Sequence, residues 1–520
     1  MLQRIHDIKI LLRIKKLGLV LFLKGLSIFT ALIFFVNFKA SNQEITDYFL
    51  DQSIDNEVFE VKLKDRLNLI NSCNIFQFSD VISNTLETVN DSYKSNKQWD
   101  KVVWISPQQI SFDLAKKNTT NFIVQHSWKI FFMTIGLGIL GSLLYIYANA
   151  VLEKSKGIYK GAIYKHKSTN KGWIAWLTTI YLIGFYLILY FRPNWAVNWT
   201  FIIDPISEFL NGQKASQWFL YGFLYCMVML VMGVRMLIKY QNNNYQKIRT
   251  ICVVFFQIVF AFLIPEIMTN LGLPAYDFKN AFPLDYDFFF DWNLDRLLSS
   301  GNIGLFILVW GVFLTLVIVP IFVYFFGKRW YCSWVCGCGG LAETLGDPYR
   351  QHSNKTLNAW KWERLTIYSV LLFSLFMTLV VLYTYIFNAN EFLGFSAYQV
   401  RGSYSFLIGS WFSGVIGTGF YPIFGNRIWC RFGCPLAAYM GIIQKFKSKF
   451  RITVNGSQCI SCGNCSTFCE QGIDVRSYAQ RNKDIVRASC VGCGICSSVC
   501  PRGVLKLENI PLNCSSSKKI

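Results

Sequence analysis

The chain has 520 residues, of which 53% are hydrophobic and 17% aromatic, a composition too apolar for an ordinary soluble protein. A formal charge of +21 is also typical of proteins that bind nucleic acid. Here, however, Lys and Arg concentrate in short segments beside apolar runs, where they set the orientation of membrane helices. Composition therefore favours a polytopic membrane protein in contact with the lipid bilayer and argues against a nucleic-acid partner.

Eight apolar runs are long enough to cross a bilayer, which takes about 20 residues in a helix. We predict crossings at residues 17–38, 128–151, 172–191, 217–238, 250–270, 303–326, 365–387 and 406–425. An even number of crossings puts both termini on one side of the membrane. The basic segments 153–172, 239–249 and 445–451 fall on that side, so the positive-inside rule predicts that both termini are cytoplasmic.

The crossings divide the chain into predicted domains. Residues 1–38 are expected to be an uncleaved membrane anchor, because Lys24 interrupts the apolar run and no small-residue cleavage site follows it. Residues 39–127 have mixed charge and scattered apolar positions, which predicts a small folded domain on the outer side. The remaining parts are crossings two to six at 128–326, a cysteine-rich cytoplasmic loop at 327–364, crossings seven and eight at 365–451, a compact cytoplasmic domain at 452–510 and a tail at 511–520.

Thirteen of the 17 cysteines lie in four clusters, and the last two clusters are copies of one pattern. Residues 459–469 and 490–500 both read C-x2-C-x2-C-x3-C, with their first cysteines 31 residues apart. Three thiolates on such a loop bind three corners of an iron–sulfur cubane, and the fourth binds the neighbouring cluster. The pattern predicts two [4Fe-4S] clusters in an α+β ferredoxin-type domain, and it disfavours structural zinc, which takes ligands in separated pairs. One cluster is assigned to Cys459, Cys462, Cys465 and Cys500, the other to Cys490, Cys493, Cys496 and Cys469.

Two further cysteine pairs, Cys332 with Cys336 and Cys430 with Cys434, follow the sixth and eighth predicted crossings with the spacing C-x3-C. Residues four apart share one face of a helix, so two such pairs on neighbouring helices could converge. Three interpretations stay open: a third iron–sulfur or other metal centre, a dithiol relay, or packing of small side chains. Packing of small side chains alone does not explain why the C-x3-C spacing occurs twice. Cys338 extends the first pair and has no counterpart in the second.

This order of motifs resembles that of the NapH/NosR/CcoG group of polytopic membrane ferredoxins. The resemblance rests on the segment CRFGCPL at 430–436, the paired C-x3-C motifs and the ferredoxin pattern after them, and it covers about residues 300–510. Members of the group usually have proline after both pairs, whereas Gly337 and Cys338 follow the first pair here.

The resemblance implies a bacterial inner-membrane protein that passes electrons between a cytoplasmic or quinone donor and a partner redox enzyme or membrane complex. Such a protein is an electron-transfer component of an oxidoreductase system. The CcoG branch implies a different activity, the reduction of a metal ion during metal-centre assembly. A redox-sensing regulator or transporter, in which the clusters control the membrane part, is the third hypothesis.

Other cofactors have less support in the sequence. Intramembrane haem needs two axial histidines, and none of His6, His126, His166 and His352 lies well inside a predicted crossing. Residues 39–127 contain no convincing attachment motif for the covalent flavin of NosR-type proteins. Glu266, near the end of the fifth crossing, is the main candidate for a quinone contact, and a carboxylate at the membrane interface is the competing interpretation.

Overall fold

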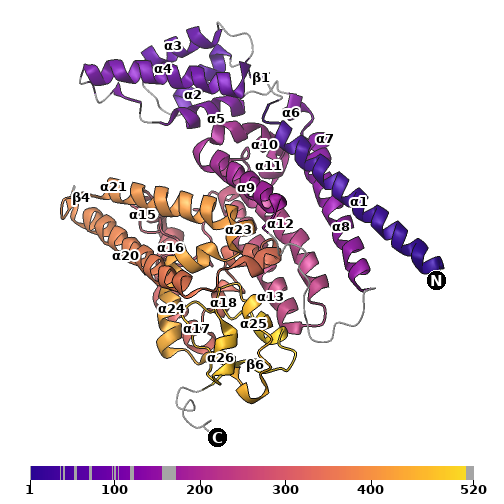
Figure 1. Cartoon of the computed structure of the whole chain (residues 1–520). Helices are drawn as coiled ribbons and strands as arrows, with labels where there is room; N and C mark the ends of the chain where they lie inside the picture. The colour runs from indigo at the N-terminus through magenta and orange to yellow at the C-terminus, as the bar shows by residue number, and fades with distance from the viewer. Residues whose placement is uncertain are drawn as a thin grey trace. The chain divides into compact units, whose positions relative to one another are not determined.

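The structure is a computed structural model in which helices form most of the chain (Figure 1). The described residues are 2–34, 37–38, 41–51, 56–68, 73–96, 98, 101–103, 105–117, 122–154, 171–389 and 391–510. The predicted tail at 511–520, His166 and most of the basic segment 153–172 lie outside them. The chain divides into two compact units. The first comprises residues 1–155 and 187–225, and the second comprises 156–186 and 226–520.

Six helices among the described residues are long and apolar enough to cross a membrane. They are Ser127–Leu152, Trp173–Phe191, Gln217–Lys239, Asn244–Asn270, Gly301–Phe326 and Leu357–Phe387. Each coincides with one of the predicted crossings two to seven. Hydropathy over about 20 residues therefore located these helices to within a few residues, except that Asn244–Asn270 and Leu357–Phe387 start earlier than predicted.

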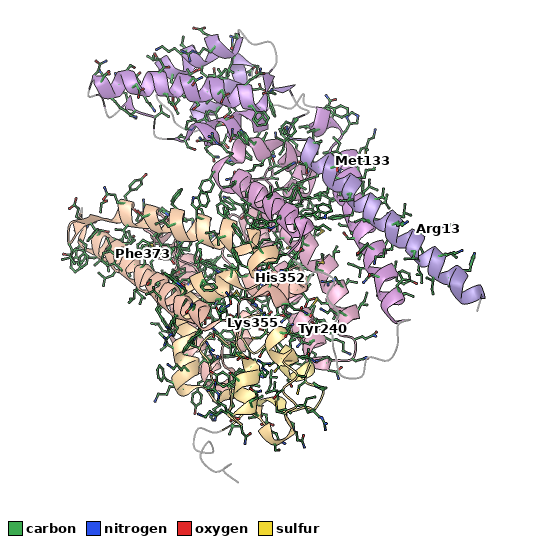
Figure 2. The ribbon with its side chains drawn as sticks, viewed as in Figure 1. Arg13, Met133, Tyr240, His352, Lys355 and Phe373 are labelled. Atoms are coloured by element: carbon green, nitrogen blue, oxygen red, sulfur yellow. The ribbon has the colours of Figure 1, made fainter. Side chains whose placement is uncertain are left out.

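The first and eighth predicted crossings form helices outside this set of six. α1 (Leu2–Ala31) carries several basic residues in its first half, of which Arg13 is labelled in Figure 2. The eighth predicted run, 406–425, contains most of a π-helix (Ser405–Ile416), α22 (Gly417–Gly419) and α23 (Tyr421–Phe424), and its serines and glycines dilute the hydropathy. α21 (Ala397–Tyr404) precedes this run. As membrane crossings, these two runs stay predictions.

In the first unit, α1 packs along α8 (Leu137–Lys154) through facing glycines. A Cβ atom added to Gly18 would lie 2.7 Å from the carbonyl oxygen of Gly141, and one added to Gly25 would lie 2.6 Å from that of Thr134. Small residues let two helix backbones approach closely, which is the packing common between membrane helices.

The described part of the segment predicted as a small domain, residues 39–127, is mostly helical. It contains α2 (Asn42–Asp51), α3 (Glu57–Asn68), β2 (Cys73–Asn74), α4 (Ile75–Ser95), α5 (Pro107–Lys117) and α6 (Phe122–Gln125), and β2 pairs with β1 (Asn37–Phe38). A capping box starts α4, because the Asn74 side chain accepts a hydrogen bond from the Gln77 amide at 2.9 Å. Lys116 of α5 pairs with Asp204 at 2.6 Å, which joins the domain to α11 (Asp204–Asn211).

The second unit holds the membrane helices that position the cysteines. α13 (Asn244–Phe255) continues through a π-helix (Phe256–Leu263) into α14 (Ile264–Asn270), and α16 (Gly301–Phe313) continues through another (Leu314–Ile318) into α17 (Val319–Phe326). α15 (Asp291–Ser299) precedes α16, and α20 (Leu357–Phe387) is the longest helix of this unit. The chain then turns at β3 (Glu391–Phe392) and β4 (Phe395–Ser396) into α21.

The C-terminal domain follows α24 (Pro435–Lys447). Its strands β5 (Phe450–Val454) and β6 (Leu505–Asn509) pair antiparallel, with Ile452 opposite Leu507. Between them lie the two cysteine loops and the short helices α25 (Asn464–Thr467), α26 (Val475–Gln480) and α27 (Ile495–Ser498). The domain contacts the membrane helices at one end, where the Lys449 amide donates to the carbonyl oxygen of Tyr324 at 2.8 Å.

Candidate functional site

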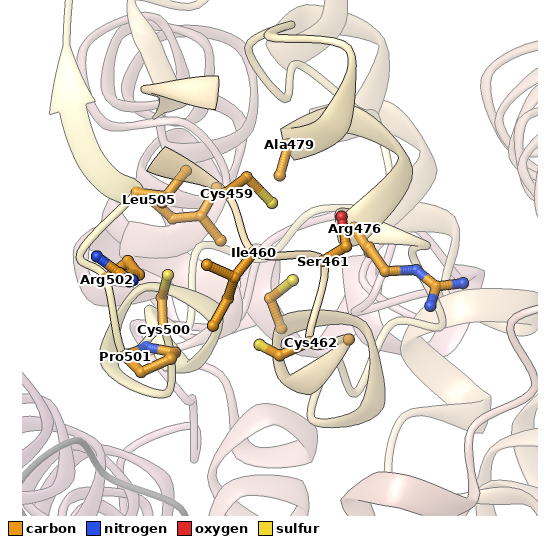
Figure 3. A pocket seen from close by; sticks show the side chains of 13 residues that line it. Cys459, Ile460, Ser461, Cys462, Arg476, Ala479, Cys500, Pro501, Arg502 and Leu505 are labelled. Atoms are coloured by element: carbon orange, nitrogen blue, oxygen red, sulfur yellow. The ribbon is translucent and has the colours of Figure 1, made fainter. Parts of the chain in front are cut away.

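The four cysteines assigned to one cluster, Cys459, Cys462, Cys465 and Cys500, line a single pocket of the C-terminal domain. Figure 3 shows Cys459, Cys462 and Cys500 with their sulfur atoms around this space. Cys462 is exposed, and the adjacent Ile460 is 55% exposed. This cysteine set therefore lies at the protein surface.

Glycines shape both cysteine loops at matching positions. Gly463 has φ 81° and Gly494 has φ 77°, values in the left-handed region that side chains rarely adopt. Each glycine immediately precedes a short helix, α25 or α27, that carries the third cysteine of its motif. The internal repeat of the sequence is thus a repeat of local structure.

The second ferredoxin set, Cys469, Cys490, Cys493 and Cys496, lies deeper. Cys490 and Cys496 are buried in one cluster, and Cys469 packs against it. Burial raises the pKa of Cys496 well above the ordinary thiol value, and the charges of the other three members raise it further. Burial likewise raises the pKa of Cys490 to about 11. A bound iron ion would favour the thiolate form of such buried thiols.

The two membrane-face pairs converge in one buried cluster. Cys332, Cys336, Cys430 and Cys434 are each only 4–6% exposed, and Cys338 packs against them. We refer to these five residues as the membrane-face cysteines. Helix geometry does not bring them together, however, and in this respect the prediction was wrong. Each pair spans a break between two helical segments.

Both pairs are built in the same way. Cys332 ends α18 (Arg329–Cys332), and Cys336 has an extended backbone just before α19 (Gly337–Thr344). Cys430 lies in a π-helix (Trp429–Gly433), and Cys434 is extended just before α24. The second cysteine of each pair therefore faces the amino end of a helix, where backbone N–H groups and the helix dipole favour an anion.

Specific donors support this preference for thiolates. The Ala437 amide donates to Cys434 Sγ at 3.4 Å, and Arg427 Nη1 donates to Cys430 Sγ at 3.7 Å. A hydrogen bond from the Cys338 thiol, together with nearby amides, holds the pKa of Cys336 down at about 6. Burial raises the pKa of Cys332 to about 12 and also raises the pKa of Cys430 and Cys434. The site thus offers converging buried thiols, the donor type of a metal or iron–sulfur centre.

The ferredoxin loop at Cys490 is docked directly on the membrane-face cysteines. The Ser333 hydroxyl donates to the carbonyl oxygen of Val491 at 2.9 Å, and the Gln444 side chain donates to that of Cys490 at 2.8 Å. Val491 belongs to the same buried cluster as Cys332, and Cys493 packs against that cluster. The two cysteine sites are therefore neighbours.

A buried network of ion pairs lies between these two sites. Glu343 pairs with Arg249 at 2.6 Å, Arg350 at 2.9 Å and Arg427 at 2.5 Å. Glu470 pairs with Arg350 at 2.8 Å and with Arg427 at 3.1 Å. Burial alone would raise the pKa of Glu343, but the three arginines outweigh it and hold that pKa well below its usual range.

The network touches a sulfur atom at each end. Arg427 reaches Cys430, and Arg350 Nη1 donates to Cys493 Sγ at 3.7 Å. Oxygens of Glu343 and Glu470 also lie near the Cys493 sulfur, a grouping that resembles a metal site, but the arginines bound to both carboxylates repel a cation there.

Glu343 and Arg350 were missed in the sequence, because they lie in a loop where charged residues are ordinary. The one local sign of Glu470 is its position, because it follows Cys469 where Pro501 follows Cys500 in the second motif. The predicted quinone contact, Glu266, is half-buried in the first turn of α14, and its role stays a prediction.

Comparison with known proteins gives two family matches. Residues 452–507 match a 4Fe-4S dicluster domain. Residues 309–356 and 407–453 match a 4Fe-4S binding domain, and these two segments contain both C-x3-C pairs. The chain therefore carries iron–sulfur domains of the 4Fe-4S type in two separate parts.

One similar protein is YccM of Escherichia coli (strain K12), which is named as an electron transport protein. The two sequences are 28% identical over 161 residues, which cover 29% of this chain and 44% of YccM. The similarity thus spans less than half of YccM. No solved structure matches the chain.

Proposed function

We propose that the protein is a membrane iron–sulfur carrier that passes single electrons between a cytoplasmic or quinone donor and a partner redox enzyme. The observation that carries this proposal is the contiguous series of three cysteine sites within one compact unit. The name of YccM and the resemblance to the NapH/NosR/CcoG group support the same function.

The two ferredoxin sets would each hold a [4Fe-4S] cluster. Cys459, Cys462, Cys465 and Cys500 would hold the surface cluster, and Cys469, Cys490, Cys493 and Cys496 the inner one. Since Cys462 is exposed and Cys490 is buried, the surface cluster is the one that a soluble donor or acceptor can approach. Electrons would pass between it and the membrane face through the inner cluster.

A third centre at the membrane face would be held by Cys332, Cys336, Cys430 and Cys434. Three observations support this assignment: the four thiols converge, Arg427 and helix amides face them, and the matched 4Fe-4S binding domain contains both pairs. Cys338 would act on this centre through its hydrogen bond to Cys336 rather than as a ligand.

The membrane arrangement is part of the proposal. One end of the second unit would hold the cysteine loop after Phe326, the loop after Gly419 and the C-terminal domain. The contacts of Ser333 and Gln444 with the ferredoxin loop support this arrangement. We place this end in the cytoplasm of a bacterium on the basis of the basic segments beside it. With α1 and the run 406–425 counted, the chain would cross the inner membrane eight times.

Reduction of the anaerobically purified full-length protein tests the function. A water-soluble quinol or dithionite should reduce the clusters reversibly, as seen by EPR, and continuous turnover should require an added partner acceptor. Clusters that no donor reduces would contradict electron transfer and favour a regulator. Catalytic reduction of free Cu(II) by the purified chain alone would instead favour the metal-reductase hypothesis.

A further inference from the structure

The pocket lined by the four surface-cluster cysteines is also lined by two arginines. Arg476 lies in α26 and Arg502 lies in the loop before β6, and both side chains are exposed. Among the described residues, no carboxylate lies within ion-pair distance of either guanidinium, and no acidic side chain lines the pocket. The rim of the pocket therefore carries unpaired positive charge.

Positive charge also dominates the rest of the C-terminal domain. The acidic residues between 452 and 510 are Glu470, Asp474, Asp484 and Glu508. Glu470 is buried in the ion-pair network, and the other three each accept a hydrogen bond from another residue of the domain. Of these four, Asp484 alone is exposed. The exposed cations of the same span are Arg476, Arg481, Lys483, Arg502 and Lys506.

An exposed apolar contact lies between the rim charges and the cluster cysteines. Ile460 is 55% exposed directly after Cys459, and Pro501 is exposed directly after Cys500. Both line the pocket together with Cys462, which is itself exposed. A small apolar centre with a charged rim is the anatomy of a protein–protein interface, in which arginine is enriched. We call Ile460, Cys462, Arg476, Pro501 and Arg502 the cluster-rim surface.

The direction of Arg476 favours a partner outside the domain. Figure 3 shows this side chain extending away from the cysteine sulfur atoms. Its charge is therefore presented to solvent, where it attracts acidic groups of an approaching molecule. A lipid headgroup meets the same charges but accepts no electron, so the exposed Cys462 favours a redox protein over a membrane surface.

We propose that the cluster-rim surface docks a soluble redox protein with an acidic face, which exchanges one electron with the surface cluster. This inference rests on the proposed function, because it requires a cluster in the pocket. The step moves a single electron: the cluster loses it and the partner gains it, or the reverse, and no bond breaks. Transient redox encounters have small interfaces. Opposite charges can raise their association rate constants from about 10⁵–10⁶ to about 10⁸ M⁻¹s⁻¹ at low salt.

Stopped-flow spectroscopy of the full-length protein in detergent tests this surface. The protein is reduced with dithionite, freed of excess reductant and mixed with oxidised plastocyanin, an acidic blue-copper carrier, or with oxidised cytochrome c, a basic carrier. With plastocyanin, Arg476→Glu/Arg502→Glu should react about tenfold more slowly than the wild type at low salt. The difference should shrink as salt screens the charges. With cytochrome c, this double variant should react no more slowly than the wild type.

A matched control changes the net charge by the same amount at other exposed sites. Lys361→Glu/Lys447→Glu alters two residues that do not line the pocket, so it should keep the wild-type rates. Iron content equal to that of the wild type shows that each variant holds its clusters.

The outcomes separate this inference from the function on which it rests. Equal plastocyanin rates in the wild type and the Arg476→Glu/Arg502→Glu variant would overturn the docking surface, and so would an equal loss of rate in the lysine control. A wild-type plastocyanin rate that does not fall with rising salt would overturn it without any variant. Clusters that dithionite fails to reduce would instead overturn the proposed function.

Discussion

Ser333 and Val491 join two cysteine sites: the Ser333 hydroxyl donates to the carbonyl oxygen of Val491 at 2.9 Å. Ser333 directly follows Cys332, and Val491 directly follows Cys490. This hydrogen bond thus joins the residue after a membrane-face cysteine to the residue after a cysteine of the second ferredoxin set. The hydrogen bond holds the two cysteine sites in contact and would give electrons a short path between them.

Ser333→Ala should slow electron exchange between the membrane-face centre and the inner cluster without changing the iron content. The variant loses the hydrogen bond, worth ~1 kcal/mol, that fixes the two loops together. Rapid-freeze EPR after mixing with dithionite measures this exchange. Ser497→Ala removes a comparable bond, to Leu505 at 2.6 Å, inside the C-terminal domain, and serves as the control. Equal exchange rates in both variants would contradict the role of Ser333.

Arg350→Gln should lower the midpoint potential of the inner cluster, because the guanidinium that faces Cys493 Sγ at 3.7 Å stabilises the reduced state. Arg350→Lys retains the positive charge near Glu470 and should shift the potential less. Potentiometric EPR gives both values. A Lys variant that shifts as far as the Gln variant would show that the effect comes from lost packing.

Cys338→Ala should leave the iron content unchanged, because Cys338 supports Cys336 by a hydrogen bond and is not a ligand in our assignment. Cys336→Ala, its matched partner, should remove the third centre and about four irons per chain. Iron and acid-labile sulfide analysis distinguishes the two results. A Cys338 variant that loses about four irons would make this residue a ligand.

Gly141→Ala should destabilise the packing of α1 on α8 by ~1–3 kcal/mol. The added Cβ would lie 2.5 Å from the Phe22 nitrogen and 2.6 Å from the Gly18 oxygen, so two backbones would have to separate. Gly138→Ala on the same helix meets no atom within 4 Å and should be tolerated. Thermal unfolding in detergent compares the two variants, and equal stability would contradict this helix interface.

The sequence predicted best what is local in the chain. The spacing of Cys459, Cys462 and Cys465 on one loop leaves little freedom, and the repeat then places Cys500 beside them. Hydropathy located six helices, because about 20 apolar residues in a row have few other solutions.

Contacts between residues far apart in the chain could not be predicted from the sequence. Gly337 and Pro435 begin new helices after each cysteine pair, so the pairs bend around breaks instead of lying on one helix face. Glu343 and Arg350 find partners only in the fold, since nothing in their local sequence marks burial. Residues 271–290 resemble an ordinary outer loop in the sequence, yet Ala281 is buried in the same cluster as Cys332.

The third centre is tested most directly by iron and sulfide analysis, with EPR, of the anaerobically purified protein and of a variant with Cys332→Ser and Cys430→Ser. Three centres in series predict about twelve irons in the wild type, about eight in the variant and the loss of one distinct signal. About eight irons and the same signals in both proteins would contradict the third centre and the continuous path that it completes.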